Sequence, residues 1–180
     1  IKNQSYPNIE HIVVDGGSTD NTVDVLETYD DRYNLKWVSE PDRGQSHALN
    51  KGINMASGEW IGWQNSDDYY LEGAFEKFKE VVICENNVDM IYGDVLIVDE
   101  NGDEIDKKFN TSPSEFIQRN WSVYANNQSA FFNKRIFEQI DLIREDLKYT
   151  MDSELIYRIL KNEFQTIHIP QPLGAFRKHR

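Results

Sequence analysis

Residues 9–17 read IEHIVVDGG, a short apolar run rich in β-branched residues that ends in two glycines. Such a run, bounded by a turn signal, predicts a β-strand. The polar residues 18–20 can cap a following helix over about residues 21–29, whose apolar side chains recur about three positions apart. The stretch therefore predicts a strand, a tight turn and a helix, with Asp15 at the carboxyl end of the strand.

The same alternation continues outward from this unit. The sequence predicts strands over Leu35–Ser39, Glu59–Trp63 and Met90–Val95, and helices over Gln45–Ala56 and about residues 74–82. Alternating strands and helices predict an α/β fold, a mostly parallel sheet flanked by helices. Ligands of such sheets bind at the carboxyl ends of the strands, where Asp15 and residues 65–68 lie.

The second half of the chain is less regular. Residues 99–103 form a polar hairpin signal, and 128–132 look extended. Helices are predicted over residues 113–120, 134–140 and 152–161. We interpret residues 1–180 as a single domain with two halves, 1–95 and 96–180.

Composition excludes several classes of protein. The chain has 180 residues, of which 39% are hydrophobic, so it is not disordered on composition. Its net charge of −12 is opposite to that of most nucleic-acid-binding proteins, and we expect no nucleic-acid partner. The single cysteine, Cys84, cannot form a disulfide within the chain, which favours a reducing compartment. No apolar run approaches the roughly 20 residues of a transmembrane helix.

Asp67 and Asp68 form the strongest chemical signal, because they follow a strand that contains Trp60 and Trp63. Adjacent carboxylates at a strand end suit a hard divalent cation, which prefers oxygen ligands. The alternative is a solvated turn in which Asp68 caps a helix. We assign both tryptophans to the core.

Other positions carry weaker signals, each with an ordinary structural alternative. A carboxylate beside glycines can contact a ribose or a base, an arginine at a helix start can meet a phosphate, and an aspartate at a helix start is either a cap or a general base. A basic terminal segment can neutralise a diphosphate or complete a metal shell. The residues concerned are Asp15, Gly17, Asp42, Arg43, Asp152, Arg177 and His179.

The order of these motifs resembles family 2 glycosyltransferases of the GT-A fold. The resemblance rests on VVDGGSTD at 13–20 with the residues before it, DRGQSHALNKG at 42–52, GEWI at 58–61 and NSDD at 65–68. It continues in residues 149–154 and 176–179, and so covers essentially the whole chain. As a set the motifs are specific for the family but not for one sugar.

The resemblance implies a nucleotide-sugar-binding half over 1–95 and an acceptor half over 96–180. It implies Asp152 as the base that deprotonates the acceptor, and Mn²⁺ or Mg²⁺ as the cofactor. It places Asn65, Asp67 and Asp68 in the DXD-type position of the family. It assigns the metal to Asp67, Asp68 and His179, and the nucleotide sugar to Asp15, Gly17, Asp42, Arg43, Asn65, Asp67 and Arg177.

The implied activity is a metal-assisted in-line displacement that moves a hexose from a nucleoside-diphosphate sugar to a glycan or another hydroxyl, with inversion. By analogy with the family, we expect the enzyme to take part in polysaccharide biosynthesis. We expect it in the cytoplasm or peripherally attached to the membrane. We expect acceptor contacts from Trp121 and Tyr124.

Two departures from the family pattern bear on this reading. Asn65 stands where many relatives have Asp, and the first strand and most of the first helix of the family are missing before Ile1. A nucleotidyltransferase is one alternative, although it normally carries a glycine-rich phosphate loop near its N-terminus. A catalytically inactive sugar-nucleotide- or glycan-binding domain is the other.

Overall fold

The computed structural model describes residues 1, 4, 6–30, 32–111 and 125–179. Its first four elements alternate as predicted: β1 (His11–Asp15), α1 (Thr22–Tyr29), β2 (Leu35–Ser39) and α2 (Gln45–Met55). β1 and β2 are parallel, with His11 opposite Leu35 and Asp15 opposite Ser39. The carboxyl ends of both strands therefore lie side by side.

The remaining strands form a six-stranded sheet in the order β3-β7-β5-β8-β4, with β6 paired to β5. They are β3 (Trp60–Ile61), β4 (Tyr69–Tyr70), β5 (Met90–Val98), β6 (Glu104–Lys108), β7 (Ala130–Asn133) and β8 (Thr166–Arg177). β5 and β8 are parallel, whereas the other pairings in this sheet are antiparallel. The sheet is thus mixed rather than mostly parallel. After β5 the chain reverses through the predicted turn at 99–103, so that β6 runs antiparallel to β5, and β7 is antiparallel to β5 as well.

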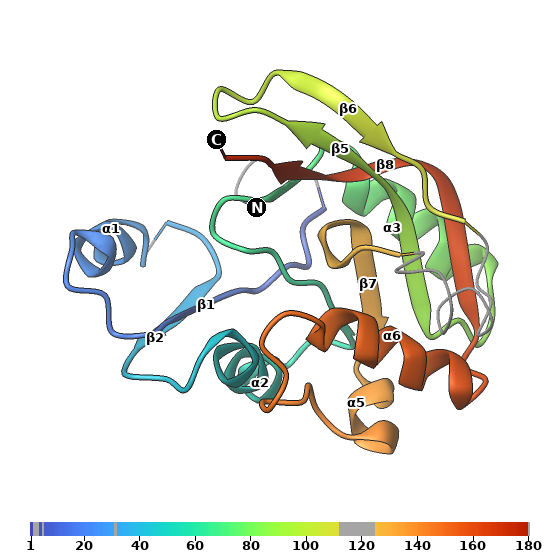
Figure 1. The fold of residues 1–180 in the computed structure, drawn as a ribbon, viewed down its shortest axis with the longest axis horizontal. Helices are drawn as coiled ribbons and strands as arrows, with labels where there is room; N and C mark the ends of the chain where they lie inside the picture. Colours follow the sequence, from blue (N-terminus) through green and yellow to red (C-terminus); the bar gives the residue numbers. More distant parts are fainter. Residues whose placement is uncertain (2–3, 5, 31, 112–124, 180) are drawn as a thin grey trace.

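Helices cover both faces of this sheet (Figure 1). α3 (Ala74–Cys84) packs on one face, and α2, α5 (Arg135–Ile140) and α6 (Met151–Lys161) pack on the other. Neighbouring residues of β5 point to opposite faces of the sheet: Met90 and Tyr92 pack in the core on the α6 side, and Ile91 packs in the core on the α3 side. The expected boundary near residue 95 falls inside β5, so the two halves of the chain share one core.

Both tryptophans of the β3 region take part in aromatic packing. Trp63 is 8% exposed and stacks on Phe132, with ring centroids 4.8 Å apart. Trp60 is half-buried and meets Phe78 edge-on at 5.1 Å. The core role that the sequence predicts for Trp63 is confirmed.

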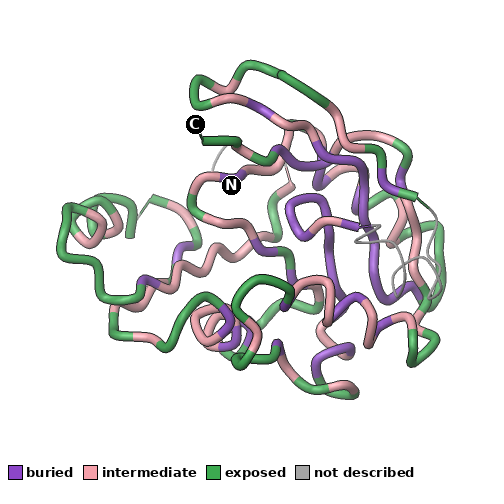
Figure 2. The backbone as a smooth tube through the Cα atoms, in the orientation of Figure 1, coloured by how far each residue is buried: buried purple, intermediate pink, exposed green. Residues whose placement is uncertain are grey.

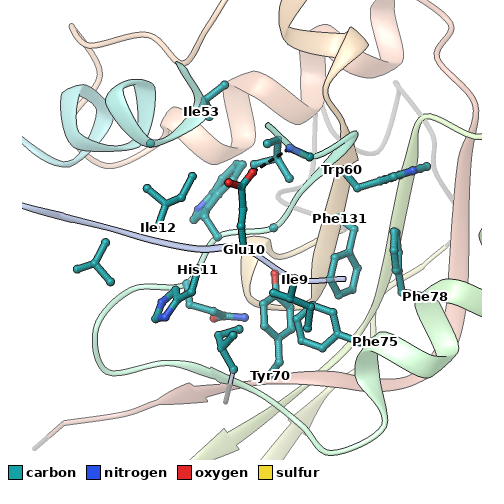
Figure 3. Close-up of a pocket in the computed structure, with 18 of the residues that line it drawn as sticks. Ile9, Glu10, His11, Ile12, Ile53, Trp60, Tyr70, Phe75, Phe78 and Phe131 are labelled. Atoms are coloured by element: carbon teal, nitrogen blue, oxygen red, sulfur yellow. Dashed lines mark hydrogen bonds between the residues drawn. The ribbon is translucent and has the colours of Figure 1, made fainter. Parts of the chain in front are cut away.

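β1, β2 and α1 form a lobe beside the main sheet (Figure 1). None of the residues of α1, all of which are described, is buried, and the lobe contrasts with the buried strands of the main sheet in Figure 2. Between β1 and β3 lies a cavity of about 1240 Å³, lined by Ile9, Ile12 and Trp60 among others (Figure 3). Within the described chain, β1 pairs with β2 alone and β3 with β7 alone.

Glu10 ties the lobe to the rest of the molecule. Its carboxylate accepts hydrogen bonds from the Ser57 amide at 2.5 Å, the Ser57 hydroxyl at 2.9 Å and the Gly58 amide at 2.8 Å. The Lys36 ammonium lies 2.7 Å away. Burial raises the pKa of Glu10, but the Lys36 contact and the backbone donors outweigh it and lower the pKa to about 2. The carboxylate therefore stabilises the fold in its ionised form.

We predict that Glu10→Gln lowers the free energy of unfolding by about 1–3 kcal/mol near neutral pH, because two amides lose a charged acceptor. A folded pKa of about 2, below the ordinary 4.5, means that the contribution is complete above pH 4.5 and disappears as the pH falls toward 2. Urea unfolding of wild type and variant at about pH 7 and about pH 3 measures the difference. The exposed Glu27→Gln is the matched control, and a pH-independent gap would contradict the assignment.

Candidate active site

Asp15 closes the turn that follows β1. Its Oδ1 accepts the Ser18 hydroxyl at 2.5 Å, and its Oδ2 accepts the Ser39 hydroxyl at 2.7 Å and the amides of Ser18 at 2.9 Å and Gly17 at 3.1 Å. The Ser18 and Ser39 hydroxyls are the main cause that lowers the pKa of Asp15 to about 2. The residue is 8% exposed, and both of its carboxylate oxygens already accept hydrogen bonds within the protein.

The loop after β2 meets this turn. A Cβ added at Gly16 would lie 2.6 Å from a carboxylate oxygen of Asp42, so glycine lets the two loops touch. Asp42 Oδ1 accepts the Gly44 amide at 2.7 Å just before α2. The Arg43 side chain is 68% exposed and points toward Glu145, since its Nε and Nη2 donate to that carboxylate at 3.1 and 2.6 Å.

Asp68 is a structural hub of the 65–68 turn. Its Oδ1 accepts the Arg177 amide at 3.0 Å, and its Oδ2 accepts Asn65 Nδ2 at 2.9 Å and Gln128 Nε2 at 3.0 Å. It is 8% exposed. The carboxylate thus joins three segments, namely the turn, the end of β8, and η1 (Asn127–Ser129).

The amide at position 65 has a physical reason. Asn65 donates to Asp68 through Nδ2, while its Oδ1 accepts Gln45 Nε2 at 2.5 Å. An ionised aspartate here would have no proton to donate to Asp68 and would place two carboxylates in contact. The departure from the family pattern is therefore matched to the local hydrogen bonds.

Asp67 and His179 are the solvent-facing residues where the 65–68 turn meets the segment after β8. His179 Nε2 lies 2.7 Å from Asp67 Oδ2, and the two side chains are 58% and 39% exposed, respectively. Within the described residues, no group of three His, Cys, Asp or Glu side chains forms a metal shell. Magnesium and manganese often bind through one or two protein ligands and substrate phosphates, so this pair fits such an ion only together with a diphosphate.

The Arg177 guanidinium supports the neighbouring hairpin. Nε donates to the Asp67 carbonyl at 3.1 Å, and Nη1 donates to the carbonyls of Asp99 at 3.3 Å and Glu100 at 2.8 Å. The group also lies over the Tyr69 ring, 5.7 Å from its centroid. Arg177 thus holds the β5–β6 turn against the 65–68 turn, and its positive charge stays near Asp67.

Asp152 is half-buried in the first turn of α6, and its Oδ1 accepts the Ser153 amide at 2.7 Å. Lys108 on β6 is the nearby cation: burial lowers its pKa, and the charge of Asp152 partly opposes this effect. No described contact joins Asp152 to Asp67 or His179. Trp121 and Tyr124, the predicted acceptor residues, lie outside the described residues.

Several residues of the site escaped the sequence reasoning. Ser39 and Gln128 complete the carboxylates of Asp15 and Asp68, Tyr69 lies under Arg177, and Glu145 holds Arg43. The only sequence signal was the position of Ser39, which is the last residue of a predicted strand. Gln128 is 60 residues from Asp68, and no local pattern links them.

Solved structures resemble this arrangement over almost the whole chain. The structure of S. aureus TarS 1–349 in complex with UDP-GlcNAc has a TM-score of 0.78 and 20% identity, covering 99% of this chain and 53% of that one. The mannosyltransferase PcManGT of Pyrobaculum calidifontis, in complex with GDP-Man and Mn²⁺, has a TM-score of 0.67 and 20% identity, covering 96% and 49%. These likenesses and the helix-covered mixed sheet define a single α/β domain of the GT-A type.

Sequence comparison then gives the family. The family model described as Glycosyl transferase family 2 matches residues 1–141, and the chain belongs to this family. An uncharacterized glycosyltransferase of Rickettsia felis is 29% identical over 167 residues, which are 88% of this chain and 27% of the relative. The chain thus spans about a quarter of that relative and about half of the two solved structures.

We predict that the two adjacent aspartates differ in their effect on stability. Asp68→Ala leaves three donors without their acceptor, the buried Gln128 amide among them, and should lower the free energy of unfolding by about 2–4 kcal/mol. Asp67→Ala, at an exposed position, should change it by less than about 0.5 kcal/mol. Urea unfolding monitored by circular dichroism measures both, and a larger effect for Asp67→Ala would refute the structural role of Asp68.

Proposed function

We propose that this glycosyltransferase moves a sugar from a nucleoside-diphosphate sugar to a hydroxyl of a glycan or another acceptor. The observation that carries the proposal is the exposed Asp67–His179 pair beside Asn65 and Arg177, in a family 2 chain. A hexose donor suits the family, since TarS was solved with UDP-GlcNAc and PcManGT with GDP-Man. We further propose, by analogy with the family, that the reaction serves polysaccharide biosynthesis on the cytoplasmic side of a membrane. No described helix is long and apolar enough to cross a membrane.

In this proposal the donor lies along the carboxyl ends of β1 and β2 and over the 65–68 turn. Asp15, Gly17 and Asp42 shape the loops that would receive the nucleoside, and Arg43 lies at the start of α2 where a phosphate gains from free amides. Asn65, Asp67 and Arg177 lie at the other turn. The sugar diphosphate would therefore span the two loop clusters.

Asp67 and His179 would hold Mn²⁺ or Mg²⁺ together with the diphosphate, with Asp68 fixing the turn behind them. The cation would neutralise charge that builds on the departing diphosphate. Arg177 adds a positive charge next to the Asp67 carbonyl. His179 Nε2 and Asp67 Oδ2 lie 2.7 Å apart, so both ligands are close to one point, and the cation would replace the hydrogen bond between them.

Asp152 would accept the proton of the attacking acceptor hydroxyl. A carboxylate in the first turn of α6 is held in place by the helix and stays half-buried. Displacement at the anomeric carbon with one base and no enzyme nucleophile inverts the configuration. A product that keeps the donor configuration would contradict this mechanism.

We predict metal-dependent binding of one nucleoside diphosphate. Isothermal titration of UDP, GDP and dTDP into the full-length protein, with and without Mn²⁺, identifies the nucleotide. Asp67→Asn should weaken the Mn²⁺-dependent binding about tenfold or more, because the metal loses a charged ligand. The exposed Asp24→Asn on α1 is the control, and equal effects of the two variants would exclude Asp67 from the metal site.

We predict that Asp152→Asn lowers kcat by about 10²–10⁴-fold and leaves nucleotide affinity unchanged. The amide keeps the shape of the side chain but cannot accept a proton at neutral pH. Release of the nucleoside diphosphate from the labelled donor measures the rate, and release of pyrophosphate would instead indicate a nucleotidyltransferase. An Asp152→Asn variant with wild-type kcat would remove Asp152 from catalysis.

A further inference from the structure

The segment of residues 141–150 joins α5 to α6, and Asp152 is the second residue of that helix. It has no regular secondary structure of its own, although all of it is described. Figure 1 shows it beside α2, on the lower edge of the molecule. Its position must therefore be set by side chains of the helices around it.

Asn50 of α2 binds the backbone of this segment at two points. Its Oδ1 accepts the Ile143 amide at 3.0 Å, and its Nδ2 donates to the Ile143 carbonyl at 2.8 Å. Asn50 is 7% exposed and Ile143 is 3% exposed, so water competes little for either bond. The side chain satisfies both backbone groups of a buried residue far away in the sequence.

Glu145 extends this contact to the donor side. Its Oε1 accepts Asn50 Nδ2 at 3.3 Å, and its Oε2 accepts the Arg43 guanidinium at 2.6 Å. The hydrogen bond from Arg43 is the main cause that lowers the pKa of Glu145. The loop after β2 and the segment before α6 are thus joined through Arg43, Glu145 and Asn50.

Arg158 of α6 holds the other end of the segment. Its guanidinium donates to the carbonyls of Ile140, Asp141 at 3.1 Å and Leu142 at 3.0 Å, and Glu154 orients it at 2.9 Å. The chain is therefore attached to α6 at residues 140–142 and to α2 at Ile143. Displacing Ile143 from α2 would move the start of α6 relative to the donor loops.

We propose that Asn50 is a positioning residue that fixes Asp152 against the donor site by anchoring Ile143 to α2. The proposal rests on the proposed function, in which Asp152 is the general base. A base displaced by about 1 Å can lose about 10²-fold in rate. The described hydrogen bonds of the Asn50 side chain go to Ile143 and Glu145, and not to the residues proposed to contact the nucleotide. Asn50 should consequently affect kcat and not donor affinity.

Asn50→Asp tests the proposal with little change in size. The carboxylate cannot donate to the Ile143 carbonyl, and it adds a negative charge beside Glu145. We expect kcat for transfer, or for hydrolysis of the donor when no acceptor is supplied, to fall about ten- to a hundredfold, with the Kd for the nucleotide within about twofold. Hydrogen exchange should accelerate in residues 143–150.

Asn54→Asp is the matched control, because Asn54 lies one turn further along the same helix and is exposed. It should leave kcat, Kd and hydrogen exchange unchanged. Glu145→Ala is a second variant at a partly exposed position, with an expected loss in kcat of about three- to tenfold and faster exchange near Ile143. It keeps the test informative if Asn50→Asp does not fold.

Each outcome distinguishes a different failure. A variant with faster exchange at 143–150 and wild-type kcat would overturn the positioning role. Weaker nucleotide binding by Asn50→Asp at unchanged kcat would place Asn50 in the donor site instead. A wild-type protein that releases no nucleoside diphosphate from any donor would overturn the proposed function itself, before any variant is measured.

Discussion

The parallel pairing of β5 with β8 is the constraint on which the site depends. It runs from Met90 opposite Thr166 to Val98 opposite Arg177, and β5 is buried along most of its length. This register carries the end of β8 to the turn at 65–68, so that His179 and the backbone of Arg177 reach Asp67 and Asp68. β5 pairs with β8 on one side and with β6 and β7 on the other, and its residues pack into the core on both faces of the sheet. The site at the end of this strand pair therefore has little freedom to shift.

Most charged groups of the site serve its construction. Asp15 and Asp68 use both carboxylate oxygens within the protein, and Arg177 is bound to three carbonyls. Asp67 and His179 remain exposed at the surface of this framework. Buried hydrogen-bonded groups hold a few accessible ones in position, so less reorganisation is needed when charge develops during a reaction.

The two sides of the molecule are connected by polar contacts as well as by the core. Glu10 joins β1 to the loop before β3, and Asn50 joins α2 to the segment before α6. Both side chains recognise backbone amides, which is possible only where the backbone has no partner of its own in a helix or strand. The connections lie at irregular segments, where packing alone would permit several arrangements.

The sequence by itself determined the alternating elements of the first half, the turn at 99–103, the order of the family motifs and the placement of Asp15 at the carboxyl end of β1. These follow from local patterns, since hydrophobic period and turn residues act over a few positions. Only the tertiary structure decided that the sheet is mixed, that Asp68 is a hub while Asp67 stays exposed, and that Arg43 turns to Glu145. These features depend on contacts such as Gln128 with Asp68, or Glu145 with Arg43, between residues far apart in the chain, and strand register and side-chain pairing across such distances leave no mark in the local sequence.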